Sequence, residues 1–321
     1  SEFEIRQQKL TTYRDQGIEP FEYDYKRSHS IAEALELVAG LDAGQTTDHH
    51  VKIAGRLKAK RGHGKAIFCN LMDASSVIQL YASVNDLSTF AQFELLDIGD
   101  IVGIEGVLFC TRRGEISVNV SSFKLLTKSL HPLPEKYHGL QDKEARYRQR
   151  YVDLIANAEV MDVFKKRSTI VHDIRNYLAD LSFMEVETPV LHHIYGGASA
   201  RPFTTHHNEL KQNLYLRIAL ELHLKRLIVG GFEKIFEIGR VFRNEGVSFK
   251  HNPEYTLLEL YQAYADYSDM MSLTENLMNH LVVKTYGTEE IEYQGQAINF
   301  QLPFKRISMR DAILEYSGLD I

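Results

Sequence analysis

Short apolar runs with a period of two dominate residues 50–127 of this chain. Turn residues at Gly62, Gly64 and Gly114 separate runs that are rich in β-branched and aromatic side chains, which is typical of consecutive short strands. Five short strands at this spacing predict a small closed β-barrel. A helical stretch at 87–96 interrupts the strand pattern, so we expect one helix within the barrel segment.

The apolar spacing becomes helical in the second half of the chain. Val160–Leu181 carries apolar residues at helical spacing, and Phe183–Thr188 predicts a strand that stops at Pro189. Phe236–Tyr267 predicts two strands joined by a polar turn over Asn244–Pro253. The patterns together predict an all-β domain followed by an α+β domain.

Two helices are expected ahead of the barrel. Residues 1–16 predict a helical arm that ends before Gly17 and Pro20, with a frayed helix in solvent as the alternative. Residues 31–41 show helical spacing up to Gly40.

Residues 129–152 separate the two domains and have the composition of a linker. They contain Pro132, Pro134 and Gly139, followed by a charged run with helical character. The boundaries that we expect are 1–49 for the arm and lead-in, 50–128 for the barrel, 129–152 for the linker and 153–321 for the second domain.

Composition narrows the class of protein. The 321 residues are 44% hydrophobic with a net charge of −6, and no stretch has the uncharged apolar length that spans a membrane. The start, SEFEIRQQKL, is too polar for a signal peptide. Cys69 and Cys110 form no CxxC pair, which favours a reducing cytoplasm and argues against a structural zinc site.

The hairpin predicted over Phe236–Tyr267 concentrates charged and aromatic side chains on one face. Alternation along each strand sorts them, and the loop between the strands adds Lys250 and His251. A purely structural hairpin rarely repeats charge on its buried face, because an unpaired buried charge is costly. The residues that share this face are Glu237, Val241 and Arg243 on the first strand, and Tyr255, Leu257, Glu259 and Tyr261 on the second.

The runs FRNEG, HNPEYT and LLELYQAYADY closely resemble motif 2 of class II aminoacyl-tRNA synthetases, in detail the lysine-specific family. This resemblance implies an antiparallel-sheet catalytic domain, and an OB-fold for the barrel that precedes it. It also implies ATP as a substrate. Arg243 would bind the α-phosphate, Glu245 the adenine amino group, and Tyr255 would stack on adenine. The implied catalytic residues are Arg243, Glu245 and His251, and the implied ATP ligands are these three with Asn252 and Tyr255.

The same resemblance implies a site for the substrate lysine. Glu221, Glu259 and Tyr261 would surround the lysine ammonium, which must be paired when buried. Gly197, in the loop GGASARPF, would contact the lysine amino group. Arg217 resembles a position that approaches the substrate.

GRLKAKRGHGKAIFCNLMD resembles the anticodon-binding barrel of that family. Phe68 would stack on an anticodon base of tRNA(Lys), while Arg61, Gln79 and Glu115 would bond base edges; a core aromatic is the alternative for Phe68. Phe109 offers a further stacking surface. The stretch from Val51 to Met72 holds six cations and no acid, namely Lys52, Arg56, Lys58, Lys60, Arg61 and Lys65.

The helix, strand and Pro189 resemble motif 1, which implies a homodimer. One departure is Ser182, where the family usually has a glycine, and serine tolerates a positive φ less well. The pairs His192-His193 and His206-His207 suggest a metal, but adjacent strand residues face opposite ways, which makes a pair a poor ligand set.

No run resembling motif 3 occurs, so we expect an incomplete catalytic domain, with the Mg²⁺ ligands in a further C-terminal part. The implied activity is lysine–tRNA ligation. The alternatives are a non-catalytic tRNA-binding or regulatory fragment or paralogue, a ligase that lysylates a protein, and an aspartate or asparagine enzyme. The barrel disfavours the protein ligase, and the paired acids Glu221 and Glu259 favour a cationic substrate.

Overall fold

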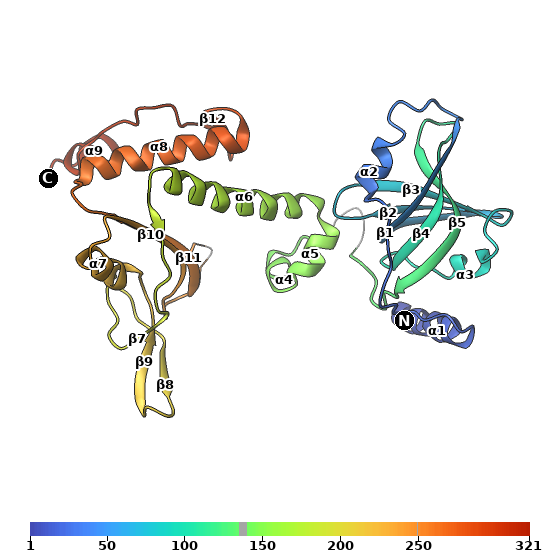
Figure 1. The fold of residues 1–321 in the computed structure, drawn as a ribbon, viewed down its shortest axis with the longest axis horizontal. Coiled ribbons are helices and arrows are strands. Elements are labelled where there is room, and N and C mark those ends of the chain that lie inside the picture. The colour runs from blue at the N-terminus through green and yellow to red at the C-terminus, as the bar shows by residue number, and fades with distance from the viewer. Residues whose placement is uncertain (135–139, 249) are drawn as a thin grey trace. The chain divides into compact units, whose positions relative to one another are not determined.

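The computed structural model describes residues 1–134, 140–248 and 250–321, so five positions of the predicted linker lie outside the described residues. The chain forms two compact units, Ser1–Val160 and Met161–Ile321, which are described separately below (Figure 1). Within the described ranges, no helix combines the length and the apolar character that crossing a membrane requires.

The first unit is a closed five-stranded barrel, so the predicted barrel is confirmed (Figure 1). Its strands neighbour one another in the order β1-β2-β3-β5-β4, and the helix α3 (Phe90–Glu94) falls inside the predicted 87–96 stretch. The strands are β1 (Thr46–His63), β2 (Ala66–Met72), β3 (Val77–Ser83), β4 (Ile101–Cys110) and β5 (Ile116–Thr127).

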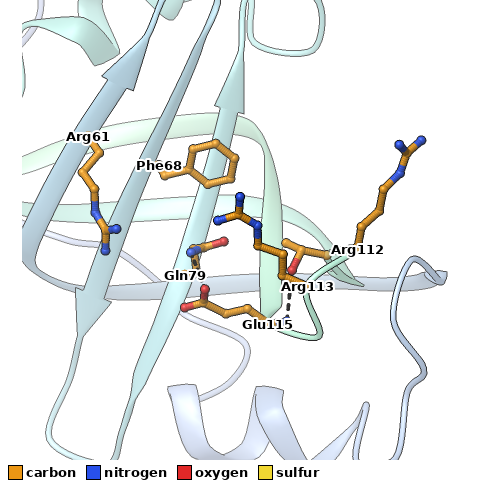
Figure 2. A pocket seen from close by; sticks show the side chains of 7 residues that line it. Arg61, Phe68, Gln79, Arg112, Arg113 and Glu115 are labelled. Carbon is orange, nitrogen blue, oxygen red and sulfur yellow. Dashed lines mark hydrogen bonds between the residues drawn. The ribbon is translucent and has the colours of Figure 1, made fainter.

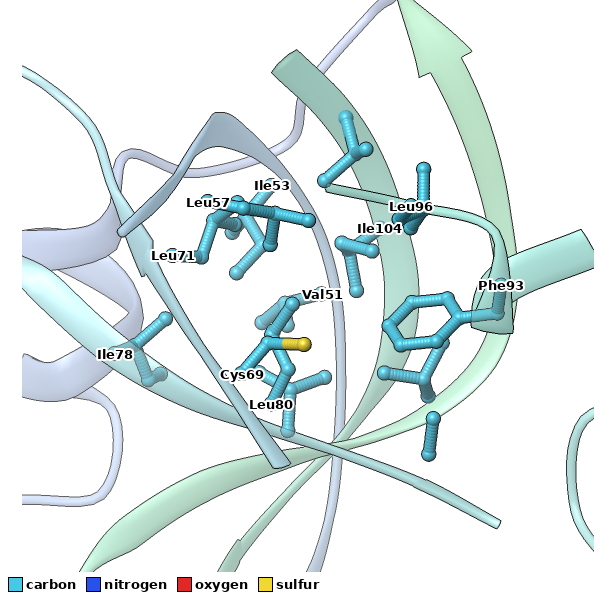
Figure 3. Packing of buried hydrophobic residues seen from close by; sticks show 14 of the residues in the cluster. Val51, Ile53, Leu57, Cys69, Leu71, Ile78, Leu80, Phe93, Leu96 and Ile104 are labelled. Atoms are coloured by element: carbon cyan, nitrogen blue, oxygen red, sulfur yellow. The ribbon is translucent and has the colours of Figure 1, made fainter. Parts of the chain in front are cut away.

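Alternation along the strands fills the barrel. On β2, Ile67, Cys69 and Leu71 are buried, while the residues between them are only half-buried. Phe93 of α3 closes one part of this core (Figure 3). Its ring is edge-on to that of Phe123, with 5.2 Å between the two centroids. The inward positions therefore supply the stability, and the outward positions of the same strands remain available for binding.

The N-terminal arm is the helix α1 (Glu2–Asp15), and it packs on the barrel. The guanidinium of Arg6 donates to the carbonyls of Ile98 (3.0 Å) and Ser129 (3.1 Å), and the hydroxyl of Tyr13 donates to the Gln92 carbonyl (2.7 Å). Arg6 and Tyr13 are buried. The alternative of a frayed helix in solvent is therefore wrong.

The helix predicted over 31–41 is shorter than expected. The helix α2 (Ile31–Glu36) begins with a capping box between Ser30 and Glu33, and its last turns do not continue the α-helix. Gly40 has a φ of +85°, a conformation that ends the helical stretch.

The short helices α4 (Lys143–Arg148) and α5 (Arg150–Ala156) follow the barrel, and the long helix α6 (Ala158–Asp180) confirms the helix expected from Val160. The predicted strand over Phe183–Thr188 is reduced to β6 (Met184–Glu185). Its pairing with β10 continues only to a bond from the Val186 amide to the Phe236 carbonyl (2.9 Å), and Pro189 then offers no donor.

The second unit is built from hairpins covered by helices. Three sheets have the orders β11-β10-β6, β7-β9-β8 and β12-β13, and within them only the β10–β6 pair is parallel. The remaining elements are β7 (Leu191–His192), β8 (Thr204–His207), β9 (Gln212–Leu216), α7 (Glu221–Val229), β10 (Lys234–Phe242), β11 (Glu254–Gln262), α8 (Tyr267–Tyr286), β12 (Glu290–Tyr293), β13 (Gln296–Asn299) and α9 (Met309–Ser317).

Candidate functional site

The β10–β11 hairpin places the predicted charged residues on one face. In its antiparallel register Glu237 lies opposite Glu259, and Val241 lies opposite Tyr255. Directly opposed residues of an antiparallel pair point to the same side of the sheet. The shared face that the sequence predicted is therefore confirmed, and the loop after β10 extends it through Arg243.

An open pocket of about 270 Å³ lies where the hairpin meets its loop. The guanidinium of Arg243 stands 5.4 Å from the ring centroid of Tyr255, and its Nε donates to the Ile218 carbonyl (3.3 Å). A guanidinium stacked on an aromatic ring suits phosphate and adenine binding together. The pocket is lined by Arg243, Glu245, Gly246, Lys250, His251, Asn252 and Tyr255.

All five residues predicted for ATP line this pocket, and the glycine-rich loop steadies one of them. The Arg201 amide donates to Oε1 of Glu245 (3.3 Å), and the Asn244 amide donates to the Arg201 carbonyl (2.8 Å). His251 Nδ1 lies 2.8 Å from the Ser248 hydroxyl. The backbone of the loop thus orients the Glu245 carboxylate toward the pocket.

A second group of side chains lies further along β11. Glu259 accepts from the Leu220 amide at Oε1 (3.0 Å) and from the Tyr261 hydroxyl at Oε2 (3.3 Å). Burial, followed by the carboxylates of Glu259 and Glu221, raises the pKa of Tyr261 above its ordinary range. The phenol therefore stays protonated and keeps its donor role near these two acids.

Gly197 closes this group from the glycine-rich loop. Its φ is +84°, and a Cβ at this position would lie 2.8 Å from the Cβ of Glu221 and 3.1 Å from that of Ala219. Only glycine combines this backbone conformation with such a close approach. Glu221 begins α7, and its Oε1 is 2.6 Å from the Lys225 ammonium. The Lys225 ammonium therefore already pairs with Glu221, one of the two acids that we expect to bind the ammonium of the substrate lysine.

Arg217 does not reach the open face, contrary to the prediction that it approaches the substrate. The residue is 4% exposed, and its Nη1 lies 2.6 Å from Oε1 of Glu237. The pair lies beneath the site, where burial favours full pairing of both charges.

The outer surface of the barrel carries a separate pocket of about 460 Å³ (Figure 2). It holds all four residues predicted for the anticodon, Arg61, Phe68, Gln79 and Glu115. The Gln79 amide donates to Oε2 of Glu115 (2.7 Å), and the Ser117 hydroxyl donates to Oε1 of Gln79 (3.0 Å). These bonds hold an amide and a carboxylate in fixed orientations, as base-edge recognition requires.

The β4–β5 loop adds residues to this pocket that the sequence prediction missed. Thr111, Arg112 and Arg113 line it, and Figure 2 shows the Arg113 guanidinium directed toward Phe68 and Gln79, while Arg112 is directed away. The adjacent Arg112 and Arg113 in CTRRGE could have indicated this part of the pocket from the sequence, since a basic loop at the rim of a barrel suits the binding of a phosphate backbone.

Phe68 is half-buried on the outer face of β2 and does not belong to the barrel core. Its ring lies 5.1 Å from that of Tyr81, which lies 6.0 Å from that of Phe109. Phe109 lines a neighbouring, mostly apolar pocket of about 210 Å³ with Asn119. The structure thus disfavours a core role for Phe68. Phe68, Tyr81 and Phe109 form a row of aromatic rings that begins at the pocket of Arg61 and Gln79.

Several of the six cationic side chains between Val51 and Met72 have partners within the fold, so the segment is a weaker basic patch than its sequence indicates. Lys52 pairs with Glu105 of β4 (2.8 Å), and Arg56 donates to the Gly99 carbonyl (2.7 Å). Lys60 donates to two carbonyls of the segment around α3, and Lys58 donates to the Ile155 carbonyl. The structure uses these cations in part to hold the barrel and its neighbouring segments together.

Metal-binding groups were sought among the described residues, and none has three or more His, Cys, Asp or Glu side chains close together. His192 is buried, with Nε2 2.9 Å from the Pro189 carbonyl and its ring 4.6 Å from that of His223. His206 bonds Asn213 within the β8–β9 hairpin. One histidine of each pair is therefore used within the fold, and neither pair forms a histidine metal site among the described residues.

The barrel and the charged hairpin together define the architecture of a class II aminoacyl-tRNA synthetase. Residues 142–321 match the family described as tRNA synthetases class II (D, K and N), and residues 51–126 match the OB-fold nucleic acid binding domain. The chain belongs to this class II synthetase family, and the predicted fold class is confirmed.

Among the members of the family, the chain is similar to lysine–tRNA ligases. It is 57% identical to the enzyme of Carboxydothermus hydrogenoformans over 98% of its own length and 64% of the relative. The identity is 53% to the enzyme of Pelotomaculum thermopropionicum, over 98% of this chain and 62% of the relative. The chain is 50% identical to the enzyme of Staphylococcus epidermidis, over 99% of this chain and 66% of the relative. The chain thus spans about two thirds of the length of these curated relatives.

Proposed function

We propose that the chain carries the nucleotide, lysine and anticodon sites of a lysine–tRNA ligase, which forms lysyl-adenylate from lysine and ATP and transfers lysine to the 3′ end of tRNA(Lys). The observation that carries this proposal is the grouping of Glu259 and Tyr261, on the hairpin that leads to Arg243, with Glu221 at the start of α7. The names of the similar enzymes support the choice of lysine.

In the proposed first step, a carboxylate oxygen of lysine attacks the α-phosphorus of ATP and pyrophosphate leaves. No side-chain nucleophile takes part, so positioning and charge stabilisation supply the catalysis. Arg243 neutralises the α-phosphate with its planar fork, while Tyr255 stacks on adenine and Glu245 accepts from its amino group. His251 and Asn252, which line the same pocket, bind the remaining phosphates.

The lysine ammonium binds between Glu259 and Glu221, with Tyr261 beside them. Glu259 uses one lone pair of each oxygen for Leu220 and Tyr261, which leaves acceptor capacity for the substrate. Gly197 allows its backbone to approach Glu221 closely, because it has no side chain that would lie between them. Aspartate and asparagine would place a carboxylate or an amide against two acids, so a cationic substrate is favoured.

The direct test is calorimetric titration of this chain with lysine, arginine and aspartate, each with and without ATP. We expect binding of lysine, weaker binding of arginine because its guanidinium is larger and planar, and none of aspartate. Lysine-dependent exchange between ATP and pyrophosphate then tests the first step. Tight aspartate binding, or equal affinity for all three amino acids, would contradict the proposal.

A tRNA-binding module without catalysis is the second candidate function. The barrel pocket supports it independently, because its residues are bonded to one another in position. Binding of an anticodon stem-loop of tRNA(Lys), combined with no lysine binding and no exchange, would select this candidate.

We also propose that the chain forms a homodimer through α6 and the segment that follows it. Large apolar side chains are exposed there, including Val163 (64%), Met184 (52%) and Ile194 (74%). Closed two-fold pairs are the commonest oligomers, and exposed apolar side chains are typical of their interfaces. Sedimentation should give a dimer at micromolar concentration and a monomer for Val163→Glu; a monomeric parent chain would contradict this.

We assign no magnesium ligand to the described residues, and no step above depends on one. A cytoplasmic location is proposed from the family and from the two buried cysteines, which are both free thiols.

A further inference from the structure

The segment from Arg217 to Leu220 contacts both substrate pockets. The carbonyl of Ile218 accepts from Nε of Arg243, which lines the nucleotide pocket (3.3 Å). The amide of Leu220 donates to Oε1 of Glu259, in the proposed lysine pocket (3.0 Å). Backbone atoms two residues apart thus orient two charged groups, Glu259 on β11 and Arg243 in the loop after β10, and a shift of this segment moves both.

The Arg217 side chain fastens this segment to the hairpin. Nη1 bonds Oε1 of Glu237 (2.6 Å) and the Thr188 carbonyl (3.0 Å), while Nε bonds the Arg240 carbonyl (2.8 Å). Its own carbonyl accepts from the Phe242 amide (2.9 Å). The guanidinium therefore joins the segment before α7 to the middle of β10 and to Thr188.

Two further residues support the Arg217–Glu237 pair. Gly239 leaves space for the guanidinium, and Thr188 bonds the carboxylate. A Cβ on Gly239 would collide with Nη2 of Arg217 and would lie 3.1 Å from Oε1 of Glu237, so no side chain at position 239 fits beside the guanidinium. The Thr188 hydroxyl donates to Oε2 of Glu237 (2.6 Å), which satisfies the second carboxylate oxygen. Arg217 and Glu237 are 4% and 2% exposed. Because both side chains are buried, removing either one would leave the other as an unpaired buried charge.

We propose that Arg217 is a positioning residue that sets the Glu259 carboxylate and the Arg243 guanidinium for their ligands without touching either ligand. The naming of these ligands as lysine and ATP rests on the proposed function. Apolar residues often stabilise a fold as well as a buried ion pair does, so stability alone does not account for this pair. A guanidinium supplies donors in several fixed directions, and this pattern is what holds the segment in one place.

The test uses two variants of this chain. Arg217→Met combined with Glu237→Gln removes the pair without leaving a buried charge, and the glutamine still accepts from Thr188. Arg217→Lys keeps the charge next to Glu237, but an ammonium cannot reach the three acceptors in their present directions. The control is Asp173→Asn combined with Lys284→Met, which removes an ion pair with one buried partner between α6 and α8 (2.7 Å).

Two readouts are measured on each variant whose melting temperature shows that it is folded. Amide hydrogen exchange at Leu220 reports the bond to Glu259 without any ligand, and calorimetry reports lysine affinity. We expect exchange at Leu220 to become at least about tenfold faster and lysine affinity to fall about tenfold in both test variants, the scale of one lost hydrogen bond to a charged group. The control should change neither.

The results separate this proposal from the proposed function. Unchanged exchange at Leu220 in a folded test variant overturns the positioning role, whether or not lysine binds. Parent-like lysine affinity in Arg217→Lys also overturns it, because a purely structural charge would be replaced by that ammonium. If the parent chain binds no lysine, the lysine assignment fails, and the exchange measurement alone decides the role of Arg217.

Discussion

Glu237 and Glu259 lie directly opposite each other on neighbouring strands, yet their environments differ. Glu237 is 2% exposed and bonded to Arg217 and Thr188, while Glu259 is half-buried and bonded to Leu220 and Tyr261. Like charges in opposed positions repel each other, so each must have its own partners. Arg217 neutralises one acid, and the other is left with acceptor capacity at the site that we assign to the lysine ammonium.

Replacing each acid by glutamine should therefore have different consequences. Glu259→Gln should lower lysine affinity by about 3–5 kcal/mol, as for a broken buried pair, and spare ATP binding. Glu237→Gln should instead lower the free energy of unfolding, because Arg217 loses its counter-ion. Calorimetry with lysine and denaturant unfolding of both variants check this. Equal lysine affinity for the parent and Glu259→Gln would refute the substrate assignment.

Gly197→Ala should damage the lysine pocket while the nucleotide pocket keeps its function. The added Cβ would meet the Cβ of Glu221 at 2.8 Å, and the φ of +84° strains any side chain. A left-handed alanine costs about 1–2 kcal/mol, and displacement of Glu221 adds to the loss of affinity. We expect lysine to bind at least about tenfold more weakly and ATP to bind as before. Gly231→Ala, at φ +106° with open space around it, is the control for strain alone.

Phe68→Ala should weaken the binding of an anticodon stem-loop. Base stacking on an aromatic side chain is worth about 1–3 kcal/mol, and Phe68 is the half-buried ring in the pocket of Figure 2. The loss should appear in fluorescence titrations with labelled stem-loop RNA, while lysine binding stays unchanged. Phe21→Ala, at an exposed phenylalanine ahead of the barrel, serves as the control. Equal RNA affinity for the parent and Phe68→Ala would leave the pocket without an anticodon role.

The sequence predicted the elements whose signals are local. Alternation within β2 separates Phe68 from the buried Ile67 and Cys69, and alternation within β11 brings Glu259 and Tyr261 to one face. A period of two therefore predicted which strand residues face the candidate sites. The five nucleotide residues and the four anticodon residues came from the resemblance to the synthetase family, and each set lines a single pocket.

Interactions between distant segments could not be predicted in this way. The pattern gave no reason to pair Arg217 with Glu237, because the partner depends on how the segment before α7 crosses the hairpin. Likewise Glu105 neutralises Lys52 from another strand, which an acid-free stretch of sequence cannot reveal. The strand at 183–188 was overestimated because its length depends on its neighbour β10 as well as on its own residues.

Ser182→Gly should stabilise the second unit. Ser182 has a φ of 66° at the turn after α6, and its Cβ is strained in this left-handed conformation. The strain of about 1–2 kcal/mol is partly offset by the larger entropy that glycine loses on folding, about 0.5–1 kcal/mol. We expect a gain of up to about 1 kcal/mol in the free energy of unfolding, measured by denaturant titration. Ser182→Val should be destabilising, since a β-branched residue tolerates this conformation least.

Tyr261→Phe should change both lysine affinity and the stability of the chain in alkali. The pKa of Tyr261 is raised by burial and by Glu259 and Glu221, so the folded chain holds the phenol proton more tightly than the unfolded chain does. An unfolded tyrosine releases its proton near about pH 10. The contribution of Tyr261 to stability is therefore complete below that pH and is lost as the pH rises above it.

Between about pH 10 and pH 12 the free energy of unfolding should consequently fall more steeply for the parent than for Tyr261→Phe. The difference in slope is at most about 1.4 kcal/mol per pH unit, and solvent screening lowers it because the ring is only part-buried. Denaturant unfolding at several pH values measures it, and Tyr264→Phe, at a tyrosine that is 96% exposed, should behave like the parent. At neutral pH the loss of the hydroxyl donor to Glu259 should weaken lysine binding by about 0.5–1.5 kcal/mol. Parallel slopes for the parent and Tyr261→Phe would mean that the two carboxylates do not act on this phenol, and the grouping of Glu221, Glu259 and Tyr261 into one lysine pocket would lose its electrostatic support.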